Sequence, residues 1–243
     1  YSNVASTQNA TAIGFDNTAS GAGATAVGFQ STASGLGGLA LGTGVVAGAQ
    51  FSTAIGFGVS TNTRTGAIII GDYSNTNFSS SPTLATADNQ FMVRAAGGTI
   101  IYSASDLSAG VTLASGGGSW ASVSDRNRKM NFRELDGEDV LRRLRNVPVT
   151  EWSYISQGAS VRHIGPMAQD FFAAFRLGTD DVTITTSDID GVNLAGIQAL
   201  IERSDRLRAE NAALRAEVSD LRTRLERLEA LEKRLEALEK RAP

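Results

Sequence analysis

A repeat of 14 residues decides the fold of the first half of the chain. It reads ATAIGFDNTASGAG at residues 10–23 and ATAVGFQSTASGLG at residues 24–37, and a degenerate copy, GLALGTGVVAGAQF, follows at residues 38–51. Pairs of an apolar residue and a glycine mark the period: Ile13-Gly14, Val27-Gly28, Leu41-Gly42, Ile55-Gly56 and, one residue late, Ile70-Gly71. A fixed period of this kind predicts structural units that stack on one another.

Each repeat predicts one short strand and one turn. Small or polar residues alternate with apolar ones up to the apolar-glycine pair, as in a strand, and Ala-Ser-Gly then supplies a turn. We expect the stacked units to form a solenoid with a thin core of Ile, Val, Leu and Ala, with glycine where the coils pack closely. Because so small a core stabilises a single chain poorly, the repeat also predicts that several chains associate.

Composition separates the chain into two parts and argues against several functions. Of its 22 Lys and Arg residues, only Arg64 and Arg94 precede Ser124. Acidic residues are interleaved with the others, so the sequence has no basic stripe for nucleic acid or for an anionic membrane surface. The chain has no Cys and one His, so we expect neither a disulfide nor a bound metal, and no motif indicates a cofactor.

Three further absences in the sequence narrow the range of proteins. No apolar stretch approaches the roughly 18 residues that a membrane-spanning helix requires. The glycines at 116–118 lack the Lys and the Ser or Thr of a phosphate-binding loop, which argues against a nucleotide-dependent hydrolase. The chain opens on Tyr1 without Met or a targeting region, and we expect that it was cut from a longer protein.

Residues 73–123 predict a linker and a β-connector. SNTNFSSSPT, at residues 74–83, is polar. NQFMVRAAGGTIIY, at residues 89–102, predicts two short strands around an Ala-Ala-Gly-Gly turn, with Phe91 and Ile101 on one face. A glycine-rich approach then leads to residue 124.

The second half predicts helices that end in a coiled coil. Residues 137–145 and PMAQDFFAAF, from Pro166, have helical periodicity, and VTEWSYI between them is typical of a strand. A long terminal helix from Leu194 carries a heptad seam with Leu at every d position: Leu207, Asn211, Leu214, Val218, Leu221, Leu225 and Leu228. Asn211, a polar residue at a core a position, either fixes the register of the coil or lies in a frayed first turn.

The segment SDRNRK, at residues 124–129, combines a nucleophile with a base. A serine hydroxyl is a weak nucleophile until a base takes its proton, and a lysine serves as that base where desolvation or cationic neighbours lower its pKa. The same letters also fit a helix-capping serine in a charged turn. His163 is a second candidate base, although a single His before Ile-Gly-Pro is more typical of a packed or hydrogen-bonded strand residue.

Over residues 3–72 the repeats resemble the head repeats of trimeric autotransporter adhesins, because both the spacing and the residue types match. The resemblance implies a left-handed parallel β-roll that assembles as a homotrimer. It also implies a receptor on a cell or host surface.

The second half resembles the intramolecular chaperone domain at the C-termini of phage tail fibres and endosialidases, which also occurs in myelin regulatory factor. The resemblance lies in SDRNRKMNFRELDG, LRNVPVTEWSY, HIGPMAQDF and the pattern DGVxLxxIQxL from Asp190, in this order. In that family a Ser and the Lys five residues further on cut the backbone just before the Ser, after trimerisation. The resemblance therefore implies that Ser124 is the nucleophile, Lys129 the base and Val123-Ser124 the scissile bond of an autoproteolytic peptidase that turns over once.

These observations predict a mainly β first half and an α+β chaperone domain that ends in a long trimeric coiled-coil helix. The predicted domains are the head repeats at 1–72, the linker and β-connector at 73–123, the self-cleaving chaperone at 124–193 and the coiled coil at 194–243.

The predicted function is that of a trimeric fibre or adhesin tip. Its chaperone domain drives trimerisation and folding of the β-roll and then cuts itself off. The alternative is a surface adhesin that does not cleave and keeps its coiled coil as a permanent stalk. Either protein is expected on a phage tail fibre or a bacterial cell surface, with itself and a surface receptor as partners, and without nucleic acid, membrane contact, metal or cofactor.

Overall fold

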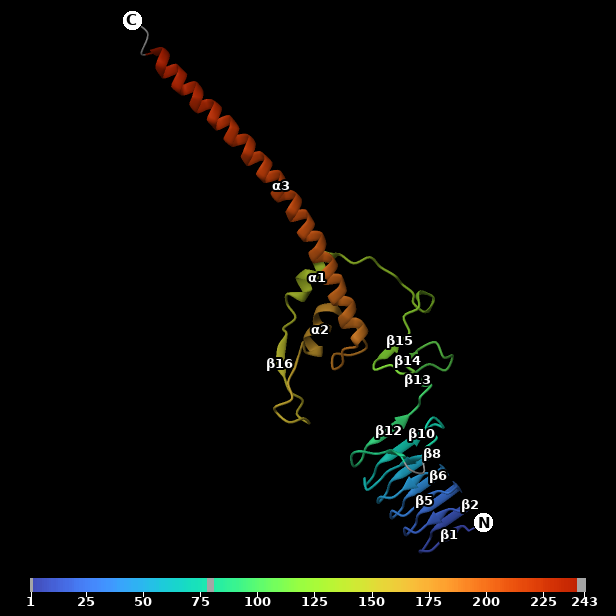
Figure 1. Ribbon diagram of the computed structural model, residues 1–243. Helices are drawn as coiled ribbons and strands as arrows, with labels where there is room; N and C mark the ends of the chain where they lie inside the picture. Colours follow the sequence, from blue (N-terminus) through green and yellow to red (C-terminus); the bar gives the residue numbers. More distant parts are fainter. Residues whose placement is uncertain (1, 78–80, 240–243) are drawn as a thin grey trace. The chain divides into compact units, whose positions relative to one another are not determined.

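The computed structural model describes residues 2–77 and 81–239, and the chain divides into two compact units, Tyr1–Met130 and Asn131–Pro243 (Figure 1). Residues 78–80 of the predicted linker, residue 1 of the predicted head and residues 240–243 of the predicted coiled coil lie outside the described residues. The first unit holds a parallel β-solenoid and a small antiparallel sheet, and the second holds a small α/β region and a long helix. The fold class expected for a single chain is therefore confirmed.

Each repeat contributes one longer and one shorter strand to two parallel sheets. The longer strands are β2 (Thr11–Phe15), β4 (Thr25–Phe29), β6 (Leu39–Thr43), β8 (Thr53–Phe57), β10 (Ile68–Gly71) and β12 (Phe91–Arg94). The shorter strands are β1 (Val4–Ala5), β3 (Thr18–Ala19), β5 (Thr32–Ala33), β7 (Val46–Ala47), β9 (Val59–Ser60) and β11 (Thr83–Leu84). Ile13 pairs with Val27, one repeat further on, so the period of the sequence is the register of the solenoid.

Alanine fills most of the core of the solenoid. The buried cluster consists of Ala19, Ala24, Ala26, Ala33, Ala40, Val45, Ala47, Ala54, Val59 and Ile69. Successive side chains of a strand point to opposite faces, so in the Ala-Ile-Gly pattern the alanine points inward and the next residue outward. The expectation that the large residue of each apolar-glycine pair belongs to the core is wrong for Ile13, which is 56% exposed, and for Leu41, which is 42% exposed.

The outward side chains of the longer strands form an apolar row on the surface of the solenoid. We call this the outward row and define it by its exposed members Ile13, Phe15, Phe29, Leu41, Ile68 and Ile70. Phe15 and Phe29 stack on each other in neighbouring strands, with ring centroids 5.2 Å apart. A contiguous exposed apolar surface is typical of an interaction site.

Glycine is required where neighbouring coils approach each other. Gly28 has a φ of +127°, and a Cβ on this residue would lie 1.9 Å from the carbonyl oxygen of Gly42 in the next coil. Gly14 and Gly56 meet the following coil in the same way. The apolar-glycine pair therefore sets the separation of the coils as well as their register.

Gly28→Ala should destabilise the solenoid by at least about 2 kcal/mol, because a positive φ and an overlap with backbone both oppose a side chain there. Gly97→Ala is the matched control, since a Cβ on Gly97 meets nothing within 4 Å. Thermal unfolding followed by circular dichroism measures both variants. Equal unfolding midpoints for the two variants would show that the coils tolerate a side chain at Gly28.

The two strands predicted around the Ala-Ala-Gly-Gly turn both form, but they belong to different sheets. β12 pairs in parallel with β10 and becomes the last longer strand of the solenoid. β13 (Gly98–Tyr102) pairs instead with β14 (Gly110–Ala114), which pairs in turn with β15 (Trp120–Ser122) in an antiparallel sheet. The turn therefore connects two sheets, and β12 and β13 do not form a hairpin. The reason is that β12 pairs with the open edge of β10 in the register of the repeat.

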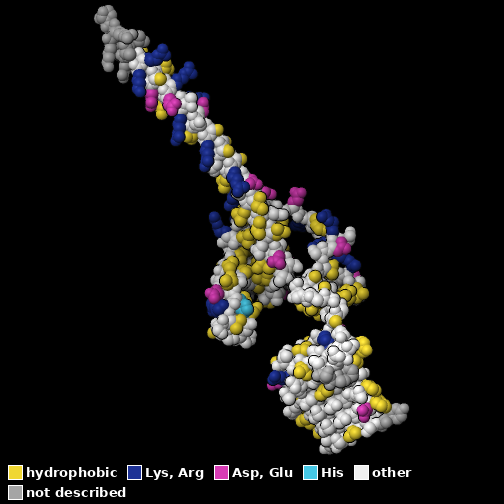
Figure 2. All heavy atoms as spheres, in the orientation of Figure 1, with side chains coloured by type: hydrophobic (Ala, Val, Ile, Leu, Met, Phe, Trp, Pro, Cys, Tyr) yellow, Lys and Arg dark blue, Asp and Glu magenta, His cyan; other side chains and the backbone are white. Residues whose placement is uncertain are grey.

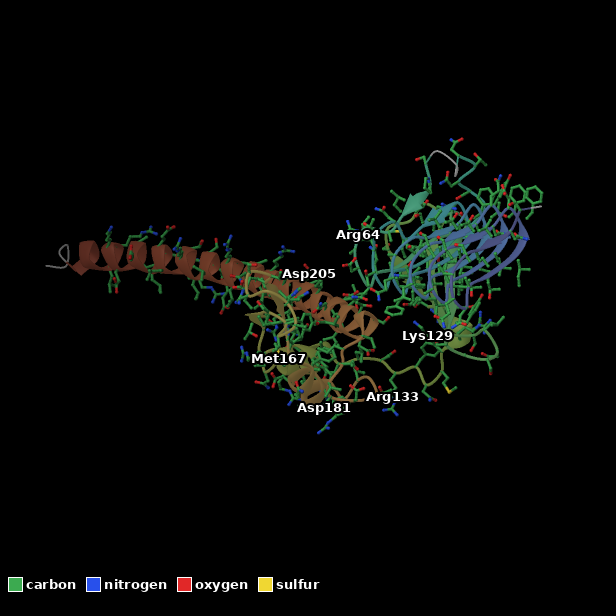
Figure 3. The ribbon with its side chains drawn as sticks, turned by 90° about the horizontal axis from the view of Figure 1, so that it is seen from below. Arg64, Lys129, Arg133, Met167, Asp181 and Asp205 are labelled. Carbon is green, nitrogen blue, oxygen red and sulfur yellow. The ribbon has the colours of Figure 1, made fainter. Side chains whose placement is uncertain are left out.

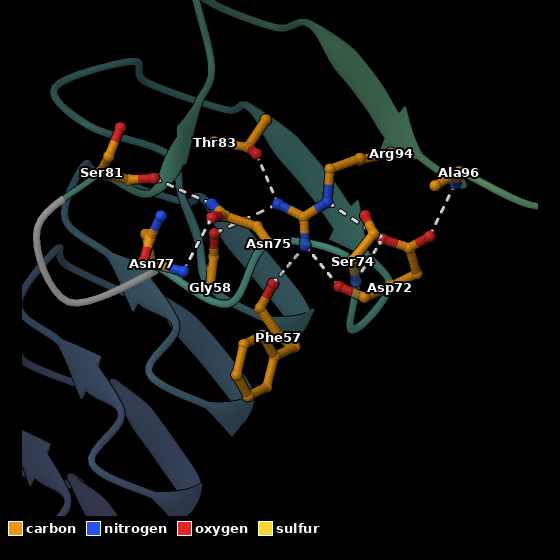
Figure 4. Close-up of polar contacts among 10 residues, drawn as sticks. All are labelled: Phe57, Gly58, Asp72, Ser74, Asn75, Asn77, Ser81, Thr83, Arg94 and Ala96. Carbon is orange, nitrogen blue, oxygen red and sulfur yellow. Dashed lines mark hydrogen bonds and ion pairs between the residues drawn. The ribbon is translucent and has the colours of Figure 1, made fainter. Parts of the chain in front are cut away.

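The Arg94 side chain closes the last coil of the solenoid (Figure 4). Its guanidinium donates hydrogen bonds to five acceptors: the Asp72 carboxylate, the Thr83 hydroxyl and the carbonyls of Phe57, Gly58 and Asp72. The contact from Nε to Oδ1 of Asp72 is 3.1 Å long, and the Arg94 side chain is only 18% exposed. One side chain thus ties four segments of the final coils to one another.

Asp72 makes the stability of this closure depend on pH. The pKa of Asp72 lies well below its ordinary value of 3.8, because the Ser74 hydroxyl, the Ala96 N–H and the Arg94 guanidinium all donate hydrogen bonds to its carboxylate. A carboxyl group whose pKa is lowered by folding stabilises the folded state above its ordinary pKa. That stabilisation is lost as the pH falls through the lowered value.

Below about pH 4 the thermal stability of the wild type should therefore fall more steeply than that of an Asp72→Asn variant, which cannot titrate at this position. Unfolding midpoints measured between neutral pH and strong acid test this. The two curves should converge in acid, and parallel curves throughout would mean that the Asp72 carboxylate contributes nothing.

The second unit is a small α/β region built on the start of a long helix. Its elements are α1 (Gly137–Leu144), β16 (Thr150–Trp152), β17 (His163–Gly165), α2 (Ala168–Phe175) and α3 (Thr186–Glu239). α1 packs against α3 closely enough that a Cβ on Gly137 would lie 2.8 Å from Cβ of Ala199. Hydrogen bonds from Arg203 and Arg206 lower the pKa of Glu138 to about 2 and fasten α1 to α3.

Two helix starts differ from the sequence expectation. α2 begins at Ala168 and not at Pro166, because Met167 has an extended backbone with a ψ of 146° and occupies the N-cap position, where its side chain makes no capping hydrogen bond. α3 begins at Thr186 and runs for 54 residues, so it is longer than the segment predicted from Leu194.

The apolar seam of α3 lies on the surface of the single chain. Its described large side chains are 47–59% exposed: Leu207, Leu214, Val218, Leu221, Leu225 and Leu228. Ile197 and Leu200 precede them at heptad spacings and are exposed as well, so the seam begins before Leu207. Figure 2 shows hydrophobic side chains at intervals along this helix. An exposed apolar seam with heptad spacing is typical of a helix that forms a coiled coil.

Candidate functional site

Ser124 lies at the junction between a strand and a turn. β15 ends at Ser122, and the Val123 N–H reaches the carbonyl of Gly110 on β14 at 3.5 Å. A single 3-10 helical turn, η1 (Arg126–Arg128), begins two residues after Ser124. The peptide bond between Val123 and Ser124 therefore lies between two hydrogen-bonded elements.

Asp125 shapes the turn that follows. It is the N-cap of η1, and its Oδ1 accepts hydrogen bonds from the backbone N–H of Asn127 at 2.9 Å and from the Asn127 side chain at 3.1 Å. The alternative interpretation of Ser124 as the capping residue is therefore wrong. Sequence reasoning missed Asp125, although an Asp directly before a helical turn is among the preferred N-cap residues.

The turn brings the side chains of Ser124 and Lys129 together. Nζ of Lys129 donates to Oγ of Ser124 at 2.7 Å, across five residues of chain. When the amine is neutral, the same contact can run in the opposite direction, with the hydroxyl donating its proton to the amine. That is the arrangement of a serine nucleophile and a lysine general base.

The surroundings of this pair are polar and open to solvent. Val123, Ser124 and Lys129 are all exposed in the single chain, and Lys129 is labelled in Figure 3. The pKa of Asp106, between β13 and β14, is lowered chiefly by hydrogen bonds from Ser108 and to a smaller extent by the charge of Arg128.

His163 is a packed strand residue. It lies on β17 opposite Trp152 of β16, and its ring stacks on the indole with centroids 4.8 Å apart. Its Nε2 lies 2.8 Å from Oε1 of Gln157. The interpretation of His163 as a packed, hydrogen-bonded residue is confirmed, and its role as a base has no support in these contacts.

No helix within residues 2–77 and 81–239 has an apolar stretch long enough to cross a bilayer. Over those same residues, no three His, Cys, Asp or Glu side chains are grouped so that they could hold a metal ion.

Two family models match the chain. A peptidase model described as chaperone of endosialidase matches residues 124–177 and so begins at Ser124. The YadA head domain repeat matches twice, at residues 5–31 and 19–44. No curated protein and no solved structure matches the chain.

The matches agree with the two resemblances drawn from the sequence. Residues 5–44, within the β-solenoid, are similar to adhesin head repeats, and residues 124–177 are similar to the chaperone of endosialidase. Together they support a fibre or adhesin with a chaperone domain, and the peptidase model supports autoproteolytic activity in general.

Proposed function

We propose that the chain is the tip of a homotrimeric fibre or adhesin, whose C-terminal domain drives assembly of the β-solenoid and then cuts itself off between Val123 and Ser124. The hydrogen bond of 2.7 Å between Lys129 and Ser124 carries this proposal. The chaperone match supports it, because that match begins at the proposed nucleophile. Such a fibre belongs on a phage tail or a bacterial cell surface, with a surface receptor for the head.

Two apolar surfaces support association of the chain with its own copies. The outward row of the solenoid and the seam of α3 are both exposed in the single chain. The seam has heptad spacing, which fits parallel helices aligned side by side, and the outward row has the register of the solenoid. Both resemblances imply homotrimers. In one trimer, neighbouring copies of the chain cover the outward row and the seam of α3 with the same symmetry.

A chaperone solves a kinetic problem of this head. A solenoid completed by three chains depends on contacts between chains, which form slowly and expose apolar strands to aggregation. A coiled coil that forms first holds the three heads near one another, at an effective concentration in the millimolar range. Once the head has folded, the coil has no further part in its stability, and an irreversible cut releases the head.

The proposed cut uses the contact between Lys129 and Ser124 at the strand–turn junction. Neutral Lys129 accepts the hydroxyl proton of Ser124 while Oγ attacks the carbonyl carbon of Val123. The bond from that carbon to the Ser124 nitrogen then breaks, and the nitrogen takes the proton back from Lys129 as a free amine. This leaves an ester between Val123 and Ser124. Water hydrolyses the ester to the Val123 carboxylate and the Ser124 hydroxyl.

We expect cleavage to start only after the chains have assembled. The nucleophile is adjacent to its own target carbonyl, so proximity contributes much of the rate. Lysine acts as a base best where it is shielded from water, because desolvation favours the neutral amine. Ser124 and Lys129 are exposed in the single chain. Cover from neighbouring chains in the trimer would provide that shielding, so cleavage reports on assembly.

The alternative is a surface adhesin that keeps α3 as a permanent stalk. The exposed seam of α3 fits this alternative equally well, because a stalk also needs a coiled coil. The two proteins differ in one respect, which is the integrity of the bond between Val123 and Ser124.

Deleting residues 207–243 from the gene should leave the head insoluble or unassembled, because the three heads are then never brought together. Leu214→Asp with Leu221→Asp, which disrupts the seam in the full-length chain, should have the same effect. Ala216→Asp with Thr223→Asp adds the same two charges on the face of α3 away from the seam, and this matched control should assemble. The soluble fraction and its elution volume on gel filtration measure all three, and a soluble, assembled head from the deletion would rule out a chaperone.

Ser124→Ala should abolish cleavage, and Lys129→Ala should slow it by roughly 100-fold to 10,000-fold, the usual contribution of a general base. His163→Ala should still cleave, because that ring is engaged elsewhere. The rate should rise with pH as the fraction of neutral amine grows. Denaturing gels with intact-mass analysis follow the reaction. Normal cleavage by Lys129→Ala, or a wild-type trimer that stays intact for days, would favour the permanent stalk.

A further inference from the structure

The contact between Ser124 and Lys129 depends on a very short element. η1 has three residues, and none of them is buried. Its backbone is held by the N–H of Arg128, which donates to the Asp125 carbonyl at 3.1 Å, and by the N–H of Lys129, which donates to the Arg126 carbonyl at 3.2 Å. Because no apolar packing supports the turn, its shape rests on hydrogen bonds in water, which individually stabilise weakly.

Asp125 makes the remaining bonds of this turn. Its Oδ1 accepts from both the backbone and the side-chain nitrogen of Asn127. Asp125 directly follows Ser124 in the chain. The turn that Asp125 caps ends at Lys129. No bond from the Asp125 carboxylate to Ser124 or to Lys129 is found among the described residues.

We infer that Asp125 is the positioning residue of the cleavage reaction, because its carboxylate caps η1 and so holds the Lys129 amine within reach of the Ser124 hydroxyl. The inference rests on the proposed self-cleavage. Asp125 acts through Lys129 and is not itself a catalytic residue. Losing an N-cap shifts the equilibrium of a marginal helical turn by roughly 2-fold to 30-fold, and the fraction of chains with an aligned dyad should fall by the same factor.

An effect of the Asp125 charge must be separated from an effect of its cap. A carboxylate near a lysine favours the protonated amine and would shift the pH dependence of the rate. Arg126 and Arg128 of η1, and Asp106, which interacts with the charge of Arg128, are unchanged when position 125 alone is substituted. Asparagine has no charge but caps helices about as well as aspartate, so it distinguishes the two roles.

The experiment compares Asp125→Ala and Asp125→Asn in the full chain, by the rate of cleavage during cell-free synthesis as a function of pH. Asp125→Ala should be slower than the wild type by roughly 2-fold to 30-fold. Asp125→Asn should restore most of the rate with an unchanged midpoint of the pH profile. A rate for Asp125→Ala equal to that of the wild type, or a shifted midpoint for Asp125→Asn, would overturn the inference.

The chain offers a matched control in a second capping aspartate. Asp136 caps α1 in the same way, accepting from the N–H groups of Glu138 at 2.9 Å and Asp139 at 3.2 Å. Asp136→Ala removes an equivalent cap from the other unit and should cleave at the wild-type rate once assembled. A similar slowing in Asp136→Ala would make the effect one of general stability and would overturn the inference.

A second measurement does not depend on cleavage. In a Ser124→Ala background, hydrogen exchange of the Asn127 amide should become faster with Asp125→Ala and stay slow with Asp125→Asn. Unchanged exchange would show that Asp125 does not cap the turn. If the wild type stays intact while the exchange responds as expected, the self-cleavage fails, and the role of Asp125 is reduced to that of a structural cap.

Discussion

The alanine core of the solenoid is the constraint on which the rest of the molecule depends. Most of its core residues are alanines, and most of the larger side chains of the longer strands point outward. Small side chains bury little apolar area, so each coil gains little stability from its own interior. The outward row therefore needs a cover, and in the proposed trimer other copies of the chain supply it.

The other parts of the chain can each be related to the need to cover the outward row. In the proposed trimer, the seam of α3 aligns the three chains before the head folds. The Arg94 closure secures the last coil through contacts within the head, so the proposed cleavage would leave it intact. The proposed scissile bond lies between an antiparallel sheet on the head side and a capped turn on the chaperone side. The proposed cleavage would separate the half that drives assembly from the half that is assembled.

The fold was predictable where spacing determines it and less so where packing does. The 14-residue period predicted stacked units and the resemblance implied their parallel arrangement, but alternation alone does not say which face points inward, and Ile13 faces outward. The pairing of β12 with β10 and the hydrogen bonds of Arg94 join residues that are far apart in sequence. Most of the acceptors are backbone carbonyls, which leave no recognisable pattern in the amino-acid sequence. Ser124 and Lys129 came from the resemblance, whereas Asp125 could have been found from the capping rule.

The number of chains in the intact protein tests the central claim most directly. Light scattering on the full-length Ser124→Ala protein, which keeps both apolar surfaces and lacks the nucleophile, measures the molar mass at micromolar concentration. The account predicts three times the chain mass of 25.4 kDa. A mass corresponding to one or two chains would contradict it, because the outward row and the seam of α3 would then lack the cover from which the whole mechanism follows.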